Sequence, residues 1–128
     1  MEKTSILICE DEMIVALDIK STLEQVGYHV IGIASGPKEA VELASRHNPD
    51  LAIMDINLGS WADGIETAKV LKKHFNTPVV FVTGNADVHT VERAMETKPV
   101  GFLTKPFDDL EFYSTISYRL DPTKNKYK

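Results

Sequence analysis

Short apolar runs alternate with longer segments of helical periodicity along the chain. Five of these runs have strand length and are almost continuously apolar, which is typical of strands covered on both faces of a parallel sheet. The predicted strands span residues 5–9, 29–34, 51–54, 78–82 and 101–104. Because a longer helical segment follows each strand, the pattern predicts an α/β fold of (βα)5 type, a doubly wound five-stranded parallel sheet.

The helical segments have recognisable ends. In the first, Val15, Ile19, Leu23 and Val26 form an apolar stripe at spacings of four, four and three, and Gly27 follows where a left-handed residue commonly ends a helix. Pro37 fits the first turn of the second helix, because proline needs no amide hydrogen there. We expect helices over residues 13–26, 37–47, 87–97 and 108–120, and one more built on Ile65, Ala68 and Leu71.

Composition narrows the class of protein. The chain has 128 residues, 43% of them hydrophobic, which suits one folded domain; we expect it over residues 1–121, with a polar tail over 122–128. With 14 basic and 19 acidic residues, the net charge of −5 argues against direct nucleic-acid binding. A single cysteine, Cys9, and the absence of a long apolar run predict a cytoplasmic protein without membrane insertion.

Polar residues follow four of the predicted strands, at the sheet edge where ligands bind in open parallel sheets. Glu10 and Asp11 follow the first strand, and Asp55 ends the third. Thr83 and Lys105 follow the fourth and fifth strands. Each residue alone is typical of a solvated loop or a cap, but the joint arrangement predicts a site. Three carboxylates against one ammonium group should raise at least one carboxyl pKa unless a cation joins them.

The donor set of this edge favours phosphoryl chemistry. Its oxygen ligands suit Mg²⁺ better than zinc. Asp55 is then a candidate nucleophile toward phosphorus, forming an acyl phosphate. Mg²⁺ and Lys105 would neutralise the transferring oxygens, and Thr83 could donate a hydrogen bond to the phosphoryl group.

Taken in order, five segments resemble the receiver domain of two-component response regulators, of the chemotaxis-receiver type. The resemblance covers residues 4–120 and implies a flavodoxin-like strand order 2-1-3-4-5. The segments that carry it are Ile6–Glu12, Met54–Leu58, Asp63–Glu66, Val82–Asn85 and Gly101–Phe107.

The resemblance also implies roles for individual residues. Asp55 would be the phosphoacceptor of a phosphorelay, receiving phosphate from a histidine kinase or phosphotransfer protein. Mg²⁺ would be bound by Asp11, Asp55 and the backbone carbonyl of Asn57, with Glu10 acting through water. Thr83 and Lys105 would contact the phosphoryl group. The family often has a cis bond at the position of Lys105-Pro106. The protein would thus be a signalling switch that catalyses its own phosphorylation and dephosphorylation, rather than an enzyme with a foreign substrate.

A switch is implied in the same way. Thr83 would move toward the phosphate, and Phe102 would turn inward behind it without the hydroxyl that a tyrosine carries there. The changed surface would consist of the fourth helix, the fifth strand and the fifth helix, which is also a candidate homodimer interface. These elements include Val91, Ala94, Met95, Phe102, Phe112 and Tyr113. For any one of these residues, packing in the core is the favoured interpretation, ahead of a place on the switch surface.

Four alternatives stay open. The chain could be a receiver fragment of a hybrid histidine kinase or a larger regulator, or a degenerate receiver that only binds partners. An aspartyl-phosphate-type phosphatase is disfavoured, because Asn57 stands where such enzymes usually need a second aspartate. A dinucleotide-binding role is weaker still, because no Gly-rich phosphate motif follows a strand.

The loop after Asp55 and the first helix each allow two interpretations. The loop over residues 55–63 has no proline and is one residue longer than is usual in receivers, and its Trp61 is either a loop packing residue or a lid near the phosphosite. The first helix carries Met13, Ile14 and Leu17 outside its core stripe. Core packing is the favoured interpretation of these three, ahead of a dimer or kinase-docking face.

Overall fold

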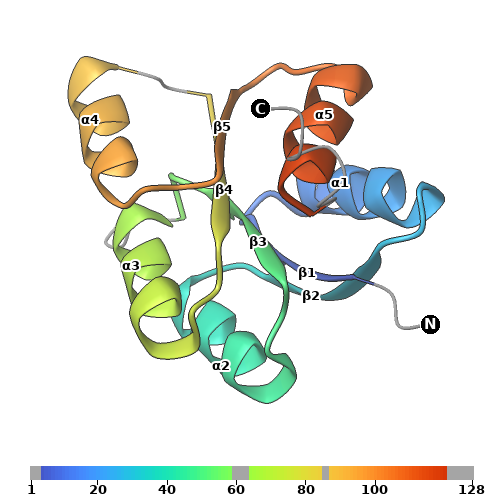
Figure 1. Ribbon diagram of the computed structural model, residues 1–128, viewed down its shortest axis with the longest axis horizontal. Coiled ribbons are helices and arrows are strands. Elements are labelled where there is room, and N and C mark those ends of the chain that lie inside the picture. Colours follow the sequence, from blue (N-terminus) through green and yellow to red (C-terminus); the bar gives the residue numbers. More distant parts are fainter. Residues whose placement is uncertain (1–3, 59–63, 85–86, 121–128) are drawn as a thin grey trace.

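A computed structural model describes residues 4–58, 64–84 and 87–120. Trp61, Asn85 and the tail over 122–128 therefore lie outside the described residues. Within them, five parallel strands form one sheet in the order β2-β1-β3-β4-β5, which confirms the predicted architecture (Figure 1). The strands are β1 (Ser5–Cys9), β2 (His29–Ala34), β3 (Leu51–Asp55), β4 (Val79–Thr83) and β5 (Gly101–Thr104).

The helices begin and end close to the predicted positions. Gly27, with φ of 97°, follows the first helix in the left-handed conformation that favours glycine. The Asp87 side chain accepts a hydrogen bond from the Thr90 amide and so caps the fourth helix. The helices are α1 (Met13–Gln25), α2 (Pro37–His47), α3 (Gly64–Phe75), α4 (Val88–Glu96) and α5 (Asp109–Leu120).

The sheet separates two apolar cores. Successive side chains of a strand point to opposite faces, so β1 sends Ile6 and Ile8 to one core and Leu7 and Cys9 to the other. Helices α1 and α5 cover the first core, and α2, α3 and α4 cover the second (Figure 1). Burial raises the pKa of the Cys9 thiol far above its usual value, which fits its predicted role as a small apolar core residue.

The exposed side of α1 corrects one expectation. Met13, Ile14 and Leu17 are 53%, 85% and 50% exposed, so the favoured core-packing interpretation of these residues is wrong. The physical reason is the helical period: Ala16, Ile19 and Leu23 already fill the stripe that faces the sheet. No helix among the described residues is long and apolar enough to cross a membrane.

Candidate functional site

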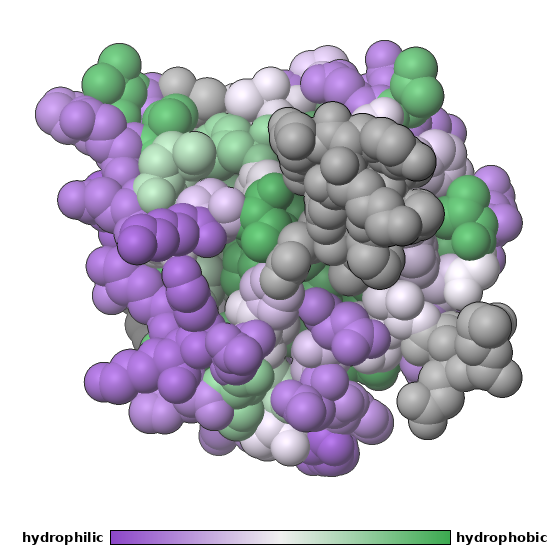
Figure 2. Space-filling model, in the orientation of Figure 1, coloured by the Kyte–Doolittle hydropathy of each residue, from purple (hydrophilic) through white to green (hydrophobic). Residues whose placement is uncertain are grey.

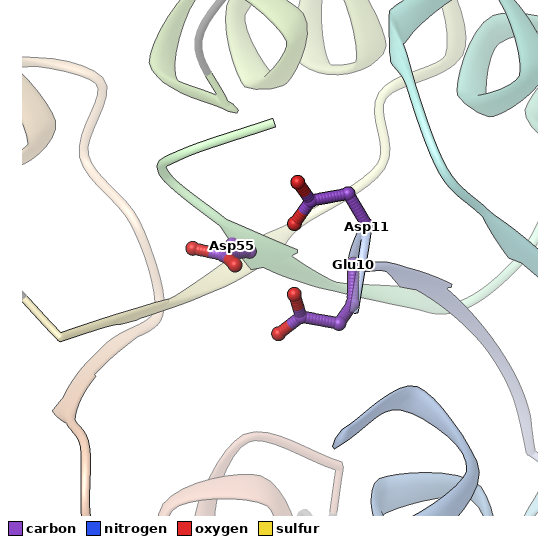
Figure 3. Close-up of side chains that lie close together, drawn as sticks. All are labelled: Glu10, Asp11 and Asp55. Atoms are coloured by element: carbon purple, nitrogen blue, oxygen red, sulfur yellow. The ribbon is translucent and has the colours of Figure 1, made fainter. Parts of the chain in front are cut away.

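Three acidic side chains converge where β1 and β3 end. Glu10 and Asp11 project from the segment after β1, and Asp55 is the last residue of β3 (Figure 3). One carboxylate oxygen of each lies within 4.8 Å of the others. The two strands are neighbours in the sheet, with Cys9 opposite Met54 in register. Parallel pairing therefore brings together acids that are far apart in the sequence.

Lys105 joins this cluster from the end of β5. Its Nζ donates hydrogen bonds to Glu10 Oε1 at 2.9 Å and to Asp55 Oδ2 at 3.3 Å. The Lys105 amide donates to the Thr83 carbonyl at 2.8 Å, which fixes the base of the side chain beside the end of β4. The Lys105-Pro106 bond is cis, as the resemblance implied. Lys105 thus supplies a partly buried positive charge to the cluster, and its backbone hydrogen bond to Thr83 fixes where its side chain starts.

The two oxygens of Glu10 and the two oxygens of Asp55 are engaged alike, each accepting a hydrogen bond from the protein. Glu10 uses its second oxygen to accept from the Glu12 amide at 3.1 Å, so both of its oxygens have protein partners. Asp55 accepts from the Asn57 amide through Oδ1 at 3.1 Å. Asp11 is exposed. Of the three acids, Asp11 is therefore the most accessible to an added cation.

The charges of the cluster shift two pKa values. Burial, followed by a hydrogen bond with Asp55, raises the pKa of Glu10 above its usual value, although the hydrogen bond from Lys105 opposes the rise. Burial alone would lower the pKa of Lys105, but the hydrogen bond to Glu10 and the two nearby carboxylates raise it overall. The excess of acids led us to expect a raised carboxyl pKa; the pKa of Glu10 is raised, but burial is its first cause and repulsion by Asp55 is the smallest.

Gly64, the first residue of α3, packs directly against the backbone that carries Asp55. A Cβ atom at this position would collide with the Asp55 carbonyl oxygen and would lie 2.9 Å from the Ile56 Cα. The Gly64 amide also donates to the Ile56 carbonyl at 2.6 Å. Sequence reasoning quoted Gly64 only as part of a motif and missed this contact, which depends on how α3 folds back onto β3.

Thr83 and Phe102, the two residues of the switch hypothesis, lie on the neighbouring strands β4 and β5. Thr83 ends β4, is fully buried and pairs in register with Thr104 of β5. Phe102 is half-buried on β5, and its ring centroid lies 6.4 Å from that of Phe81. Both side chains therefore have neighbours through which a change at the acidic cluster could reach β5.

The residues named for the switch surface differ in exposure. Ala94 and Phe112 are 0% and 1% exposed and belong to the two cores, which confirms the favoured core interpretation for these two. The Tyr113 hydroxyl donates to the Thr22 carbonyl at 3.4 Å, which places this side chain against α1 instead of α4. Helix α5 turns its aromatic residues toward α1 because both helices cover the same face of the sheet. Of the expected residues, Met95 is the one that is more than half exposed, at 52%.

A divalent cation fits the chemistry of this donor set. Glu10, Asp11 and Asp55 offer only oxygen atoms, which suit Mg²⁺ and do not favour zinc. When ionised, the three acids outnumber the single ammonium of Lys105, so a doubly charged cation would balance the local charge. Mg²⁺ usually takes one or two protein carboxylates and keeps several waters, so three acids at this site are enough to hold it.

The chain was compared with protein families, with curated proteins and with solved structures. A model of the response regulator receiver domain matches residues 6–117. The chain belongs to this family. It is 38% identical over 102 residues to the transcriptional regulatory protein PdtaR of Mycobacterium tuberculosis, a match that covers 80% of the chain and 49% of PdtaR. It is 35% identical over 118 residues to the phyllosphere-induced regulator PhyR of Methylorubrum extorquens, covering 91% of the chain and 43% of PhyR.

Solved structures agree with this placement. The signal receiver domain of a modulated diguanylate cyclase from Desulfovibrio desulfuricans G20 superposes with a TM-score of 0.87 at 34% identity, covering 99% of this chain and 100% of that one. A receiver domain protein from Methanospirillum hungatei JF-1 has a TM-score of 0.87 at 24% identity and shows the fold alone. The chain spans about half the length of the curated relatives it matches.

Proposed function

We propose that this receiver domain is a phosphorylation-dependent switch of two-component signalling, with Asp55 as the phosphoacceptor. The observation that carries the proposal is the position of Asp55: it is 5% exposed, and its Oδ2 lies 3.3 Å from Lys105 Nζ. Glu10 and Asp11 flank it with oxygens within 4.8 Å. This combination supports Asp55 as a nucleophilic carboxylate whose negative charge is partly balanced by the ammonium group of Lys105.

The chemistry that the residues support is an in-line transfer. An Asp55 carboxylate oxygen forms a bond to phosphorus, and the phosphorus–nitrogen bond of a partner's phosphohistidine breaks, its electron pair and a proton remaining on the imidazole. Lys105 neutralises the transferring oxygens, and the Thr83 hydroxyl donates a hydrogen bond to the product. Hydrolysis of the acyl phosphate ends the signal.

Bound Mg²⁺ would supply further neutralisation of charge at the transferring oxygens. Asp11, Asp55 and the carbonyl of Asn57 are the ligands we propose. Glu10, whose two oxygens already accept hydrogen bonds from Lys105 and Glu12, would act through water. This division is the one that the resemblance to receiver domains implies.

The exposed apolar side of α1 supports a docking surface for the phosphodonor. Met13, Ile14 and Leu17 lie at the start of the helix, immediately after the acidic pair, and are half to fully exposed. Apolar residues gathered next to a reactive group are typical of a protein interaction site. We propose that a histidine kinase or phosphotransfer protein docks here in the cytoplasm. A second copy of the chain could meet the α4–β5–α5 surface through Met95 instead.

Acetyl phosphate and Mg²⁺ test the function without a partner protein. We expect intact-mass analysis to show one added phosphoryl group on the wild type and none on Asp55→Asn. Asp50→Asn is the matched control, because Asp50 precedes the same strand at its other end and bonds to Ser5. It should be labelled like the wild type.

Two results would contradict the proposal. One is absence of label on a folded wild type with Mg²⁺ present. The other is equal label on Asp55→Asn, which would place the acceptor elsewhere. Sustained release of phosphate from a generic phosphate ester, lost in Asp55→Asn, would favour the phosphatase alternative.

A further inference from the structure

A cleft of about 270 Å³ lies at the end of the sheet opposite to Asp55. It is bounded by the second half of α3, by the turn that leads from α3 into β4, and by the turn from α4 into β5. Its volume is near the lower end of the roughly 300–1,000 Å³ of small-molecule sites. The cleft shares no residue with the acidic cluster, so it stands apart from the proposed phosphosite.

The lining of this cleft combines cations with aliphatic surface. Lys72 and Lys98 contribute ammonium groups, and none of the described residues that line the cleft is acidic. Ala68, Pro78 and Pro99 provide apolar walls. On the face shown in Figure 2, hydrophilic residues gather over α3, so the surroundings are polar as well. A lining of this kind favours a small ligand that carries a negative charge and an apolar body.

Two helices end at the cleft, and their carbonyl groups would repel an anion if they were uncapped. The structure shows that they are capped. The Asn76 amide donates to the Lys72 carbonyl at 3.0 Å, and the Lys98 amide donates to the Met95 carbonyl at 3.0 Å. Lys72 Nζ itself donates to the Thr97 carbonyl at 2.9 Å, which joins α3 to the end of α4. An ammonium group has three donors, so this bond leaves Lys72 able to hold a ligand.

One buried polar group at the cleft lacks a protein partner. Thr77 is 1% exposed, and its hydroxyl oxygen has no hydrogen bond. Leaving a buried hydroxyl unpaired is unfavourable, and buried polar side chains almost always have a partner. Thr77 is one of the residues that line the cleft, together with Lys72 and Lys98. Its hydroxyl oxygen is itself buried, so a ligand with an acceptor oxygen would become its partner after a small movement of the cleft wall.

We propose that this cleft is a binding site for a small organic anion, such as a carboxylate on an aliphatic or aromatic body. Lys72 and Lys98 hold the charged group, the Thr77 hydroxyl donates to it, and the prolines contact the apolar body. The occupant bridges α3 and the turn into β5. Because Phe102 follows that turn on β5, the site is placed to favour one arrangement of the strand on which the proposed switch depends.

Benzoate is a suitable probe, with benzamide as its neutral counterpart. Backbone amide chemical shifts of the labelled full chain would be followed by nuclear magnetic resonance during titration. We expect saturable shifts at Thr97, Lys98 and Val100, with a dissociation constant of about 1 mM or lower. Benzamide should bind about ten-fold more weakly, because it lacks the charge that the lysines recognise.

Substitutions locate the site. Lys72→Met and Lys98→Met should each weaken benzoate binding about ten-fold, and Thr77→Val should weaken it by a smaller factor. Lys98→Met retains the bond between Lys72 and Thr97, so it reports on binding even if Lys72→Met alters the fold. Lys73→Met is the matched control, because this exposed neighbour is not among the lining residues. It should bind as the wild type does.

Three outcomes would overturn the proposal. They are no saturable shift in the folded protein, equal binding of benzamide and benzoate, and equal weakening by Lys73→Met and Lys72→Met. The last outcome would mean that benzoate associates with surface lysines in general. Asp55→Asn should bind benzoate normally, so failure of this proposal and failure of the proposed phosphoryl chemistry give separate results.

Discussion

The two ends of the sheet bury polar groups in opposite ways. At the carboxyl end, Glu10 and Asp55 are 2% and 5% exposed, and Lys105 bonds to both. At the amino end, the Thr77 hydroxyl is buried without a partner, and the nearby Lys72 bonds to a backbone carbonyl. The carboxyl end thus has an acidic cluster hydrogen-bonded to Lys105. The amino end has a cleft lined by lysines, where one buried hydroxyl has no hydrogen-bond partner. The contrast indicates that the same fold can offer sites of opposite charge at its two ends.

The largest effect should come from closing the space beside Asp55. Gly64→Ala places a Cβ atom against the Asp55 carbonyl, and neither backbone can move without displacing the acceptor. We expect a loss of at least about 3 kcal/mol in the free energy of unfolding, measured by urea denaturation. The molecules of Gly64→Ala that remain folded should be phosphorylated by acetyl phosphate less than the wild type is.

Gly84→Ala is the control for this substitution. A Cβ atom at Gly84 meets nothing within 4 Å, so its effect on stability should stay within about 1 kcal/mol. A Gly64→Ala protein as stable as Gly84→Ala would show that the close approach of α3 to Asp55 is not a constraint. The benzoate cleft should respond to neither substitution beyond any general loss of structure.

Removing the internal cation should make the carboxyl end resemble the amino end, with buried groups left unpaired. Lys105→Met is expected to lower the free energy of unfolding by about 2 kcal/mol without Mg²⁺, because the two carboxyl groups lose their common partner. Mg²⁺ should restore part of this loss. Lys38→Met, at an exposed position of α2, should change stability by less than about 0.5 kcal/mol. An equal loss with and without Mg²⁺ would count against a metal beside Lys105.

The contrast also explains which features could be predicted from the sequence. Acids and a lysine placed directly after apolar runs predict a site, because parallel strands end at one edge of the sheet. The acidic convergence and the strand order were therefore predictable. The cleft was not, because Lys72, Thr77 and Lys98 belong to a helix and two turns whose approach depends on tertiary packing.

The same limit applies to individual side chains. Helical period placed Ile19 and Leu23 correctly in the core, but it also placed Val26 there, and Val26 is 50% exposed because the helix ends at Gln25. The fifth helix was placed correctly, but its rotation turned Tyr113 toward α1 and Phe112 into the core. Rotation of a helix is set by the side chains it meets, and a single sequence contains that information only indirectly.

Replacing the unpaired hydroxyl should raise stability. Thr77→Val keeps the shape of the side chain and removes the buried polar group, so we expect a gain of about 1 kcal/mol in the free energy of unfolding. Thr97→Val is the matched control in the same cleft. The Thr97 hydroxyl donates to the Ala94 carbonyl at 2.7 Å, so its removal should lower stability by about 1 kcal/mol. Losses in both variants would show that Thr77 has a partner after all.

The smallest effect concerns pH and the charge of Glu10. Burial and the hydrogen bond with Asp55 raise the pKa of Glu10 in the folded protein, so folding favours its protonated form. The stability that Glu10 contributes is therefore fully present below its unfolded pKa of about 4.3 and is lost as pH rises through the folded pKa. Glu10→Gln imitates the protonated form, so it should be more stable than the wild type at neutral pH with a chelator present.

That advantage should shrink as the pH is lowered toward the unfolded pKa, whereas Glu24→Gln, at an exposed position of α1, should show no such trend. Urea denaturation at several pH values measures the difference. A constant difference would mean that packing, and not ionisation, separates the two proteins. Mg²⁺ should stabilise the wild type more than Glu10→Gln, because the added cation balances a charge that only the wild type carries. The acidic end would then be stable only when its excess charge is matched, by a proton at low pH or by a metal at neutral pH.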